Sequence, residues 1–287
     1  MAAPPIVTST LRTILPRSAR NWLRDPRKTL QWGIDAGRFA LGQVENLEMR
    51  PGWVLRAHPL AARCAYEPLR QDPEQRAELD SFLAACVPGM RLLDVGAHFG
   101  IFSLAALHHG GPTASAVAVD PSGTAAHMLA VHANLNACSD RLLVVQACAG
   151  EVDGWHGMLD TGVIGAGYFV EADANRRADD LSNVRAVSID ALCAELKFTP
   201  THVKIDVEGE ELAALRGASG LLAGPHAPTV FLELHNDILR DRGRDPEDVL
   251  DWLSARGFTC EDVLTGPVRL ITFLRPVSRL VARPKAN

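Results

Sequence analysis

In Arg91-Leu92-Leu93-Asp94-Val95-Gly96-Ala97-His98-Phe99-Gly100, a short apolar run ends in an acidic residue, turns through two glycines and enters an apolar helical pattern at Ile101. The pattern predicts a buried strand, a tight loop and the start of a helix. In open α/β sheets, ligands bind beside such loops, at the carboxyl ends of the strands. Because glycine has no Cβ atom, we expect a ligand to lie against the backbone at Gly96 and Gly100.

The spacing of these glycines narrows the class of ligand. It is Gly-x-x-x-Gly, without the middle glycine of the dinucleotide-binding pattern Gly-x-Gly-x-x-Gly. Asp94, two residues before the first glycine, favours a cationic ligand over a pyrophosphate. S-adenosylmethionine, with its ammonium group, is such a ligand. For this motif alone, a purely structural strand–helix turn is the alternative.

The residues after this loop alternate between apolar strands and helices of about a dozen residues. This alternation predicts an α/β fold with a doubly wound, mostly parallel sheet. We expect the last two strands to form an antiparallel pair. Strands are predicted at 92–95, 116–119, 142–147, 184–189, 202–206, 229–234, 258–263 and 269–274, and helices at 101–109, 124–136, 211–222 and 246–255.

The chain divides by pattern into three parts. Residues 1–85 show no strand–helix alternation and are predicted to form a mainly helical N-terminal cap, with a helix at 74–86. Residues 86–276 form the α/β domain, interrupted at 154–184 by a glycine-rich and charged insertion near the site. Residues 277–287 are basic with two prolines, so we expect a flexible tail.

The composition restricts the classes of function and the compartment. A net charge of −5 argues against a nucleic-acid partner. Six scattered cysteines without a Cys-x-x-Cys pair favour free thiols in a reducing, cytoplasmic compartment. No apolar run has the roughly 20 residues of a membrane span. Residues 1–19 lack the apolar region of a signal peptide; they are interpreted as a solvated lead-in segment, with a basic, weakly amphipathic surface helix as the alternative.

Four acidic residues fall at or near the ends of successive predicted strands: Asp94, Asp120, Asp206 and Glu233. Carboxyl ends of parallel strands meet at one edge, so these side chains are predicted to line a crevice. Asp120 lies about 20 residues beyond the glycine loop, where an acid receives the ribose hydroxyls of a nucleoside. A solvated turn before Pro121 is the alternative.

The predicted strand at 202–206 carries charge into the sheet. Lys204 and Asp206 are two residues apart, so they share one face and should pair with each other or with a ligand. Glu208 follows at the entrance of the next helix. His235, just past the next strand, is a candidate general base, with a hydrogen-bonded loop histidine as the alternative. Asp190 is interpreted as a helix N-cap rather than a catalytic residue.

Several blocks together resemble the FkbM-type S-adenosylmethionine-dependent methyltransferases. They are Asp94 to Ser103, Asp120-Pro121, Asn134-Leu135-Asn136, Ser188 to Leu192, Lys204-Ile205-Asp206-Val207-Glu208-Gly209-Glu210-Glu211 and Leu215 to Ala218. The resemblance runs from about 78 to 235. It implies a seven-stranded Rossmann-like sheet and methyl transfer, usually to a hydroxyl of a sugar, glycolipid or natural product.

The resemblance also implies roles for individual residues. Asp94, Gly96 and Gly100 would hold the methionine part of the cofactor, and Asp120 the ribose. Adenine would lie near Cys148 and Ala149. His98, inside the loop, would help to shape the pocket. It replaces the commoner Asn of the family, and Asp120 stands where Glu is more frequent.

The sequence restricts the choice of catalytic base to two residues without deciding between them. We expect Asp206 or His235 to be the base, with Lys204 and Glu208 organising the site. A divalent metal such as Mg²⁺, with Asp206 and Glu233 as candidate ligands, stays open. Catechol-type methyltransferases hold magnesium with an acid at the position of Asp206 and an Asp-Asn pair after the next strand, where this chain has the different pattern Glu233-Leu234-His235-Asn236.

The alternatives differ in class. N-methylation is the second choice of reaction, and a non-catalytic methyltransferase-like scaffold is the second choice of function. A nicotinamide-dependent oxidoreductase is disfavoured by the missing middle glycine. The acceptor, a small molecule or a carbohydrate- or lipid-linked compound, would be selected by residues 1–85 and the insertion, which carry no transferable motif.

Overall fold

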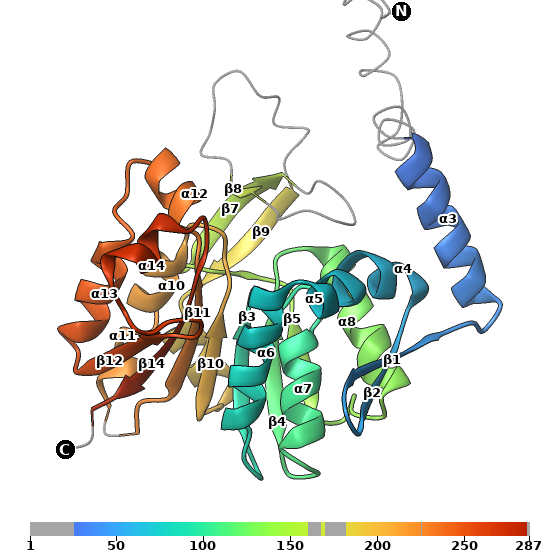
Figure 1. The fold of residues 1–287 in the computed structure, drawn as a ribbon, viewed down its shortest axis with the longest axis horizontal. Helices are drawn as coiled ribbons and strands as arrows, with labels where there is room; N and C mark the ends of the chain where they lie inside the picture. The colour runs from blue at the N-terminus through green and yellow to red at the C-terminus, as the bar shows by residue number, and fades with distance from the viewer. Residues whose placement is uncertain (1–25, 160–167, 170–181, 225, 286–287) are drawn as a thin grey trace, which may run out of the picture.

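The computed structural model describes residues 26–159, 168–169, 182–224 and 226–285, and a large central sheet dominates it (Figure 1). The strands of this sheet are β3 (Arg91–Val95), β4 (Ser115–Val119), β5 (Leu142–Val145), β10 (His202–Ile205), β11 (Thr229–Leu234), β12 (Phe258–Asp262), β13 (Gly266–Pro267) and β14 (Ser278–Pro284). Their order is β13-β12-β14-β11-β10-β3-β4-β5. From β11 to β5 all neighbours are parallel, whereas β14 is antiparallel to both of its neighbours.

This topology confirms the predicted Rossmann-like, doubly wound and mostly parallel sheet. Among the described residues the sheet has eight strands rather than seven, because the two-residue β13 adds an edge. Alternate residues of a strand face opposite layers of core. Leu92 packs in one cluster with the N-terminal elements, and its neighbour Leu93 packs in the other.

The helices that follow the strands are close to the predicted ranges. Those of the first half are α7 (Ile101–His109) and α8 (Gly123–Leu135). The predicted helix at 211–222 is divided into α10 (Glu211–Arg216) and α11 (Ser219–Ala223). Helix α12 (Asn236–Asp241) lies outside the predicted helical ranges, whereas α13 (Glu247–Ser254) lies where a helix is predicted.

Residues 26–85 are mainly helical and include one hairpin. The elements are α3 (Pro26–Ala40), β1 (Glu45–Arg50), β2 (Trp53–Ala57), α4 (Pro59–Ala61), η1 (Ala62–Tyr66), α5 (Glu67–Gln71) and α6 (Pro73–Ala85). The carboxylate of Asp72 accepts the backbone N–H groups of Glu74 and Gln75, which fixes the start of α6. Phe82 of α6 is fully buried between the rings of Phe102 and Phe231, so this region shares the core of the sheet.

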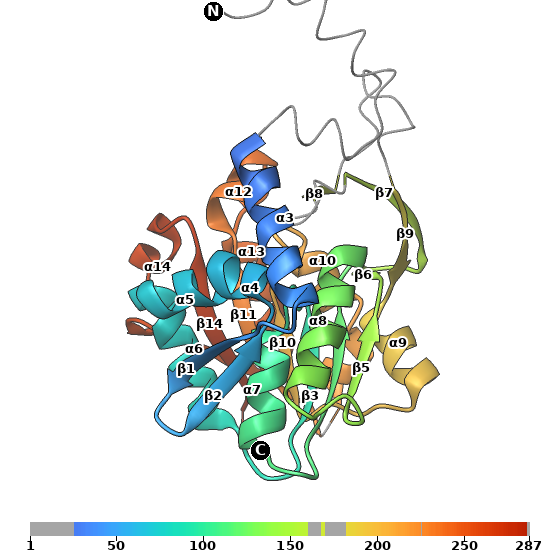
Figure 2. The same cartoon turned by 90° about the vertical axis from the view of Figure 1, so that its right-hand side faces the viewer.

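A second, smaller sheet contains the described part of the insertion. Its strands are β6 (Cys148–Ala149), β7 (Gly154–Leu159), β8 (Tyr168–Phe169) and β9 (Ser182–Val187), in the order β6-β9-β7-β8. The rest of the predicted insertion, 160–167 and 170–181, lies outside the described residues. Figure 2 shows β7, β8 and β9 rising from the edge of the molecule near β5 and β6.

The N-cap prediction for Asp190 is wrong. Helix α9 (Ile189–Leu196) is capped by Ser188, whose hydroxyl accepts the N–H of Ala191. The carboxylate of Asp190 instead accepts the backbone N–H groups of Gly220 and Leu221, at 2.7 and 2.8 Å. It therefore satisfies the start of a different helix, α11.

The C-terminal prediction also needs correction. Residues 270–274 form helix α14 (Leu270–Leu274) rather than a strand, and the flexible tail predicted from 277 contains β14. Leu280, Val281 and Ala282 are buried, and β14 pairs with β11 on one side and β12 on the other. The arginines around these apolar residues suggested a solvated segment, but Arg279 is itself buried among carboxylates.

No helix in the described residues has the length and continuous apolar sequence that a membrane span requires.

Candidate active site

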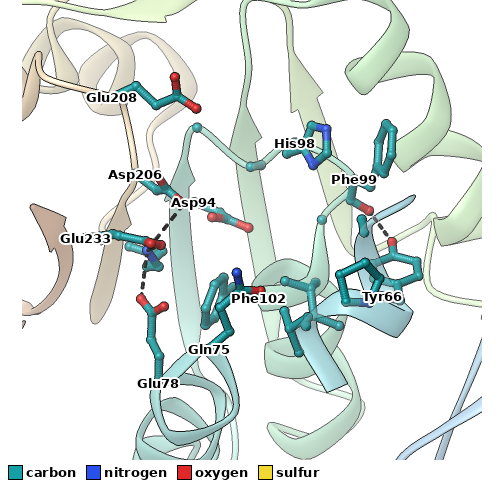
Figure 3. A pocket seen from close by; sticks show the side chains of 18 of the residues that line it. Tyr66, Gln75, Glu78, Asp94, His98, Phe99, Phe102, Asp206, Glu208 and Glu233 are labelled. Carbon is teal, nitrogen blue, oxygen red and sulfur yellow. Dashed lines mark hydrogen bonds and ion pairs between the residues drawn. The ribbon is translucent and has the colours of Figure 1, made fainter. Parts of the chain in front are cut away.

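A cavity of about 320 Å³ lies between the glycine loop, the carboxyl ends of β10 and β11, and the segment from η1 to α6 (Figure 3). It brings together most of the residues singled out by sequence. Those lining it are Asp94, Gly96, His98, Gly100, Lys204, Asp206, Glu208, Glu233 and His235. Asp120, Cys148 and Ala149 are not among the described residues that line it. The N-terminal region contributes a wall that includes Leu69, Gln75 and Glu78.

The glycines of the loop are needed for the packing of the loop against its neighbours. Gly96 and Gly100 have φ angles of +79° and +85°, in the left-handed region. A Cβ atom on Gly96 would lie 1.7 Å from the carbonyl oxygen of Asp206, and one on Gly100 would lie 2.0 Å from Cδ1 of Leu129 in α8. Their missing side chains therefore let β10 and α8 approach the loop.

Asp94 anchors the helix that follows the loop. Its carboxylate is 1% exposed and accepts both the backbone N–H and the hydroxyl of Ser103, at 3.0 and 2.6 Å. Burial raises the pKa of Asp94 to about 6, although the hydrogen bonds from Ser103 and the charge of Lys204 oppose this shift. The residue therefore lines the cavity and fixes α7 at the same time.

Asp120 holds the loop from the side of β4. One of its oxygens accepts the backbone N–H of His98 at 2.8 Å, and the other accepts that of Ser122 at 2.8 Å. His98 has a φ of +49° and its ring stacks on Phe99, with centroids 3.9 Å apart. Burial lowers the pKa of His98 to about 4, so its imidazole is neutral at physiological pH.

Cys148 and Ala149 are buried in β6, in the smaller sheet. The thiol of Cys148 donates to the carbonyl oxygen of Arg185 at 3.4 Å. Burial raises the pKa of this thiol to about 11, so it stays protonated.

Lys204 lies at the back of the cavity with no exposed surface. Its Nζ is 3.0 Å from Glu78 Oε1, 3.7 Å from Glu233 Oε2 and 3.8 Å from Asp206 Oδ2. The predicted pairing of Lys204 with Asp206 is thus confirmed, but Glu78 is the nearer partner. Nζ also lies 4.9 Å from the ring centroid of Phe102. Burial opposes the charged form of Lys204, but these three carboxylates outweigh it and raise its pKa.

Arg279 of β14 completes the same cluster. Its Nε donates to Glu78 Oε2 at 3.1 Å, and its two terminal nitrogens donate to Glu233 at 3.0 Å and to Glu74 at 2.8 Å. Two buried cations, Lys204 and Arg279, are therefore shared among carboxylates from α6, β10 and β11. Sequence reasoning missed both Glu78 and Arg279, because one belonged to an ordinary helix face and the other to a segment interpreted as a tail.

The carboxyl groups of the cluster do not ionise alike. Burial raises the pKa values of Glu78, Asp206 and Glu233, while the nearby cations oppose this. A hydrogen bond between Asp206 and Glu233 raises the pKa of Glu233 and lowers that of Asp206. Asp206 has the most exposed side chain of the three, at 31% compared with 14% and 5%.

His235 forms a second charged unit at the mouth of the cluster. Its Nδ1 lies 2.8 Å from Oε1 of Glu211, which has no exposed surface, and its Nε2 lies 3.7 Å from Asp206 Oδ1. Burial opposes protonation, but the Glu211 hydrogen bond and the charge of Asp206 raise the pKa of His235 to about 9. The imidazole is thus a cation at neutral pH, whereas a general base has to be neutral.

A neutral hydrogen-bond network ties the N-terminal region to the glycine loop. The hydroxyl of Tyr66 donates to the carbonyl oxygen of Phe99 at 2.6 Å and lies 2.9 Å from Nδ1 of His132. Nε2 of His132 accepts the backbone N–H of His58, which places the ring proton on Nδ1. Burial lowers the pKa of His132 to about 4. No pattern in the sequence indicates this network.

The two candidate metal ligands, Asp206 and Glu233, take part in ion pairs with protein cations. Asp206 and Glu233 both face Lys204. In the described part of the chain, no group of three or more His, Cys, Asp or Glu side chains is arranged to hold a metal ion.

A family model described as the methyltransferase FkbM domain matches residues 94–260, which is more than half of the chain. The chain belongs to this methyltransferase family. The match begins at Asp94 and covers the glycine loop, the Lys204–Asp206 pair and His235, and it ends before β14. No curated protein sequence matches the chain.

Solved structures with a similar fold include several methyltransferases. One is precorrin-6y C5,15-methyltransferase from Geobacter metallireducens, with 14% identity over 75% of this chain and 90% of that one and a TM-score of 0.41. Another is an O-methyltransferase from Bacillus cereus in complex with SAH, with 10% identity, 75% and 82% coverage and a TM-score of 0.45. A third is ribosomal protein L11 methylase from Lactobacillus delbrueckii subsp. bulgaricus, with 13% identity, 74% and 79% coverage and a TM-score of 0.40.

Proposed function

We propose that this methyltransferase uses S-adenosylmethionine to methylate a hydroxyl group of a small molecule or a carbohydrate- or lipid-linked acceptor, such as a sugar, glycolipid or natural product. The observation that supports the proposal best is the cavity itself. One side of it is the glycine loop, and the other side carries Asp206 beside two fixed cations. A cofactor site and a candidate proton acceptor thus face the same space.

The residues present suit the cofactor. The carboxyl groups facing the cavity, those of Asp94, Glu78, Asp206, Glu208 and Glu233, outnumber the cations Lys204 and His235. Such an excess of carboxylates favours a ligand that carries positive charge on sulfur and nitrogen. When bound, S-adenosylmethionine supplies a methyl group on a positively charged sulfur.

The cofactor contacts are proposed residue by residue. Asp94, Gly96 and Gly100 would hold the methionine part, with the neutral His98 beside it. Asp120 would receive the ribose, from a carboxylate that also accepts the backbone N–H groups of His98 and Ser122. Cys148 and Ala149 remain the proposed neighbours of adenine.

Asp206 is the proposed proton acceptor. Its Oδ1 faces the imidazolium of His235 and its Oδ2 faces Lys204, so two cations favour its ionised form. Its partial exposure lets an acceptor hydroxyl reach it, whereas Glu78 and Glu233 are more deeply buried. Lys204 and His235 then act by keeping Asp206 charged and oriented, and the main contribution of the site is to position the acceptor.

Two experiments test the proposal in sequence. Calorimetry against S-adenosylmethionine, S-adenosylhomocysteine and NAD should show binding of the first two only. Binding of NAD alone would contradict the proposal, and no binding of any of the three would favour the scaffold alternative.

The second experiment is a methyl-transfer assay against a host extract, with mass identification of the labelled product. It separates O- from N-methylation. In this assay Asp206→Asn should lower turnover by about 10²-fold or more without weakening cofactor binding. The matched control is Asp140→Asn at an exposed position. An Asp206→Asn variant with the turnover of the wild type would remove Asp206 as the proton acceptor.

A further inference from the structure

Helix α3 has one face that is packed on the protein. Trp32, Asp35 and Phe39 lie on this face, at helical spacing. The carboxylate of Asp35 is 1% exposed and accepts two hydrogen bonds from Arg63 of η1, at 2.6 and 3.0 Å. Trp32 packs against the main core cluster, and the ring of Phe39 lies 4.4 Å from that of His58. These contacts fix how the helix is rotated about its axis.

The opposite face of the helix exposes large apolar side chains. Leu30 is 65% exposed, Ile34 48% and Leu41, just past the helix end, 81%. At roughly 100° per residue these positions fall within about 40° of one another and roughly 180° from the packed face. We call Leu30, Ile34 and Leu41 the outer stripe. Because the packed face is fixed, the stripe does not turn inward to join the core.

The sequence around the outer stripe is strongly basic. Residues 1–28 contain six basic residues and one acidic residue, Asp25, a net charge of +5. Since the whole chain has a net charge of −5, the remaining residues carry −10. The basic residues are Arg12, Arg17, Arg20, Arg24, Arg27 and Lys28. Positive charge is therefore concentrated in the stretch of sequence that leads into α3 and in the first residues of the helix.

We propose that the outer stripe of α3 docks on an anionic lipid bilayer. An amphipathic helix lies in the interface of a membrane when apolar side chains enter the headgroup region and basic residues meet anionic lipids. A second copy of this chain is the less favourable occupant, because both copies would carry the same excess of positive charge in residues 1–28. A negatively charged surface complements this charge.

Vesicle co-sedimentation of the full-length protein tests the docking. We expect binding to vesicles of phosphatidylcholine mixed with phosphatidylglycerol, little binding to phosphatidylcholine alone, and weaker binding at high salt. The double variant Leu30→Glu/Ile34→Glu should lower the affinity for the anionic vesicles by about tenfold or more. Leu274→Glu, at a position 71% exposed on α14, is the matched control and should bind as the wild type does.

Two other outcomes overturn the proposal: the wild type does not bind the anionic vesicles, or Leu274→Glu loses as much affinity for them as the double variant does. Analytical ultracentrifugation that shows a dimer converted to monomer by the double variant, without vesicle binding, would assign the stripe to self-association. Both substitutions are at exposed helix positions where Glu is a good helix former, so the variant should fold, and its thermal unfolding checks this. Binding of S-adenosylmethionine is measured separately, so its failure would not affect the vesicle result.

Discussion

The charge state of His235 leads to a prediction about stability that does not depend on the reaction. The imidazole is 13% exposed, and contact with Glu211 and Asp206 raises its pKa from 6.5 to about 9 despite burial. A raised pKa means that the folded state binds this proton more tightly than the unfolded state does. The stabilisation is therefore complete below pH 6.5 and is lost as the pH rises through 9.

The magnitude follows from the size of the shift. It spans 2.5 pH units, from 6.5 to 9, and each unit corresponds to about 1.4 kcal/mol, which gives about 3.5 kcal/mol in total. In the variant His235→Gln this titration is absent. The variant should be less stable than the wild type at pH 6.5, and the difference in free energy of unfolding should shrink by about 2.5 kcal/mol between pH 6.5 and pH 9, because each state is half titrated at its own pKa.

Urea denaturation of both proteins across this pH range measures the difference. His226→Gln, at an exposed position, is the control and should show no such pH dependence. Nuclear magnetic resonance of the His235 ring would give its pKa directly. A stability difference that does not change with pH, or a ring that titrates near 6.5, would refute the charged Glu211–His235–Asp206 arrangement.

Four further substitutions test the packing around the site and in α3. Glu78→Gln removes the nearest carboxylate from the buried Lys204 and should lower the free energy of unfolding by about 2–3 kcal/mol in urea denaturation. The loss is limited because two other carboxylates remain near Lys204. An unchanged denaturation midpoint would contradict the pairing. Gly96→Ala should destabilise the protein by more than about 3 kcal/mol, since its Cβ would overlap a backbone carbonyl. Gly33→Ala, with open space around it, should instead stabilise α3 by about 0.5–1 kcal/mol. Equal effects of the two substitutions on thermal unfolding would be inconsistent with this geometry. Tyr66→Phe removes a hydrogen bond to the glycine loop and should cost about 1–2 kcal/mol of stability and weaken S-adenosylmethionine binding in calorimetry; wild-type values of both would show that the bond is dispensable.

The parts of the fold that the sequence predicted are those encoded locally. The strand, loop and helix around Gly96 follow from an apolar run, two glycines and a helical period within twenty residues. The pairing of Lys204 with Asp206 follows from their spacing on one strand. In each case the residues that decide the structure are close together in the chain, so the pattern is visible without knowledge of the fold.

The rest of the site depends on contacts between distant segments. Glu78 and Arg279 are 201 residues apart and meet only because β14 is inserted between β11 and β12. Glu211 looked like an ordinary first-turn acid of a helix, and only the tertiary structure shows that it holds His235. The packing requirement at Gly96 is hidden from the sequence pattern in the same way, because the carbonyl group that excludes a side chain there lies at the end of another strand.

The central position of β14 has a consequence for how the enzyme is made. This strand is the last of the described elements in the chain, yet it lies inside the sheet and carries the arginine that neutralises Glu78 and Glu233. During synthesis, a chain that has not yet reached 278 has an open seam beside β11 and surplus negative charge behind the cavity. Contacts this distant in sequence also form slowly. We therefore expect the cavity to be absent from the growing chain and to appear only when the entire sheet closes.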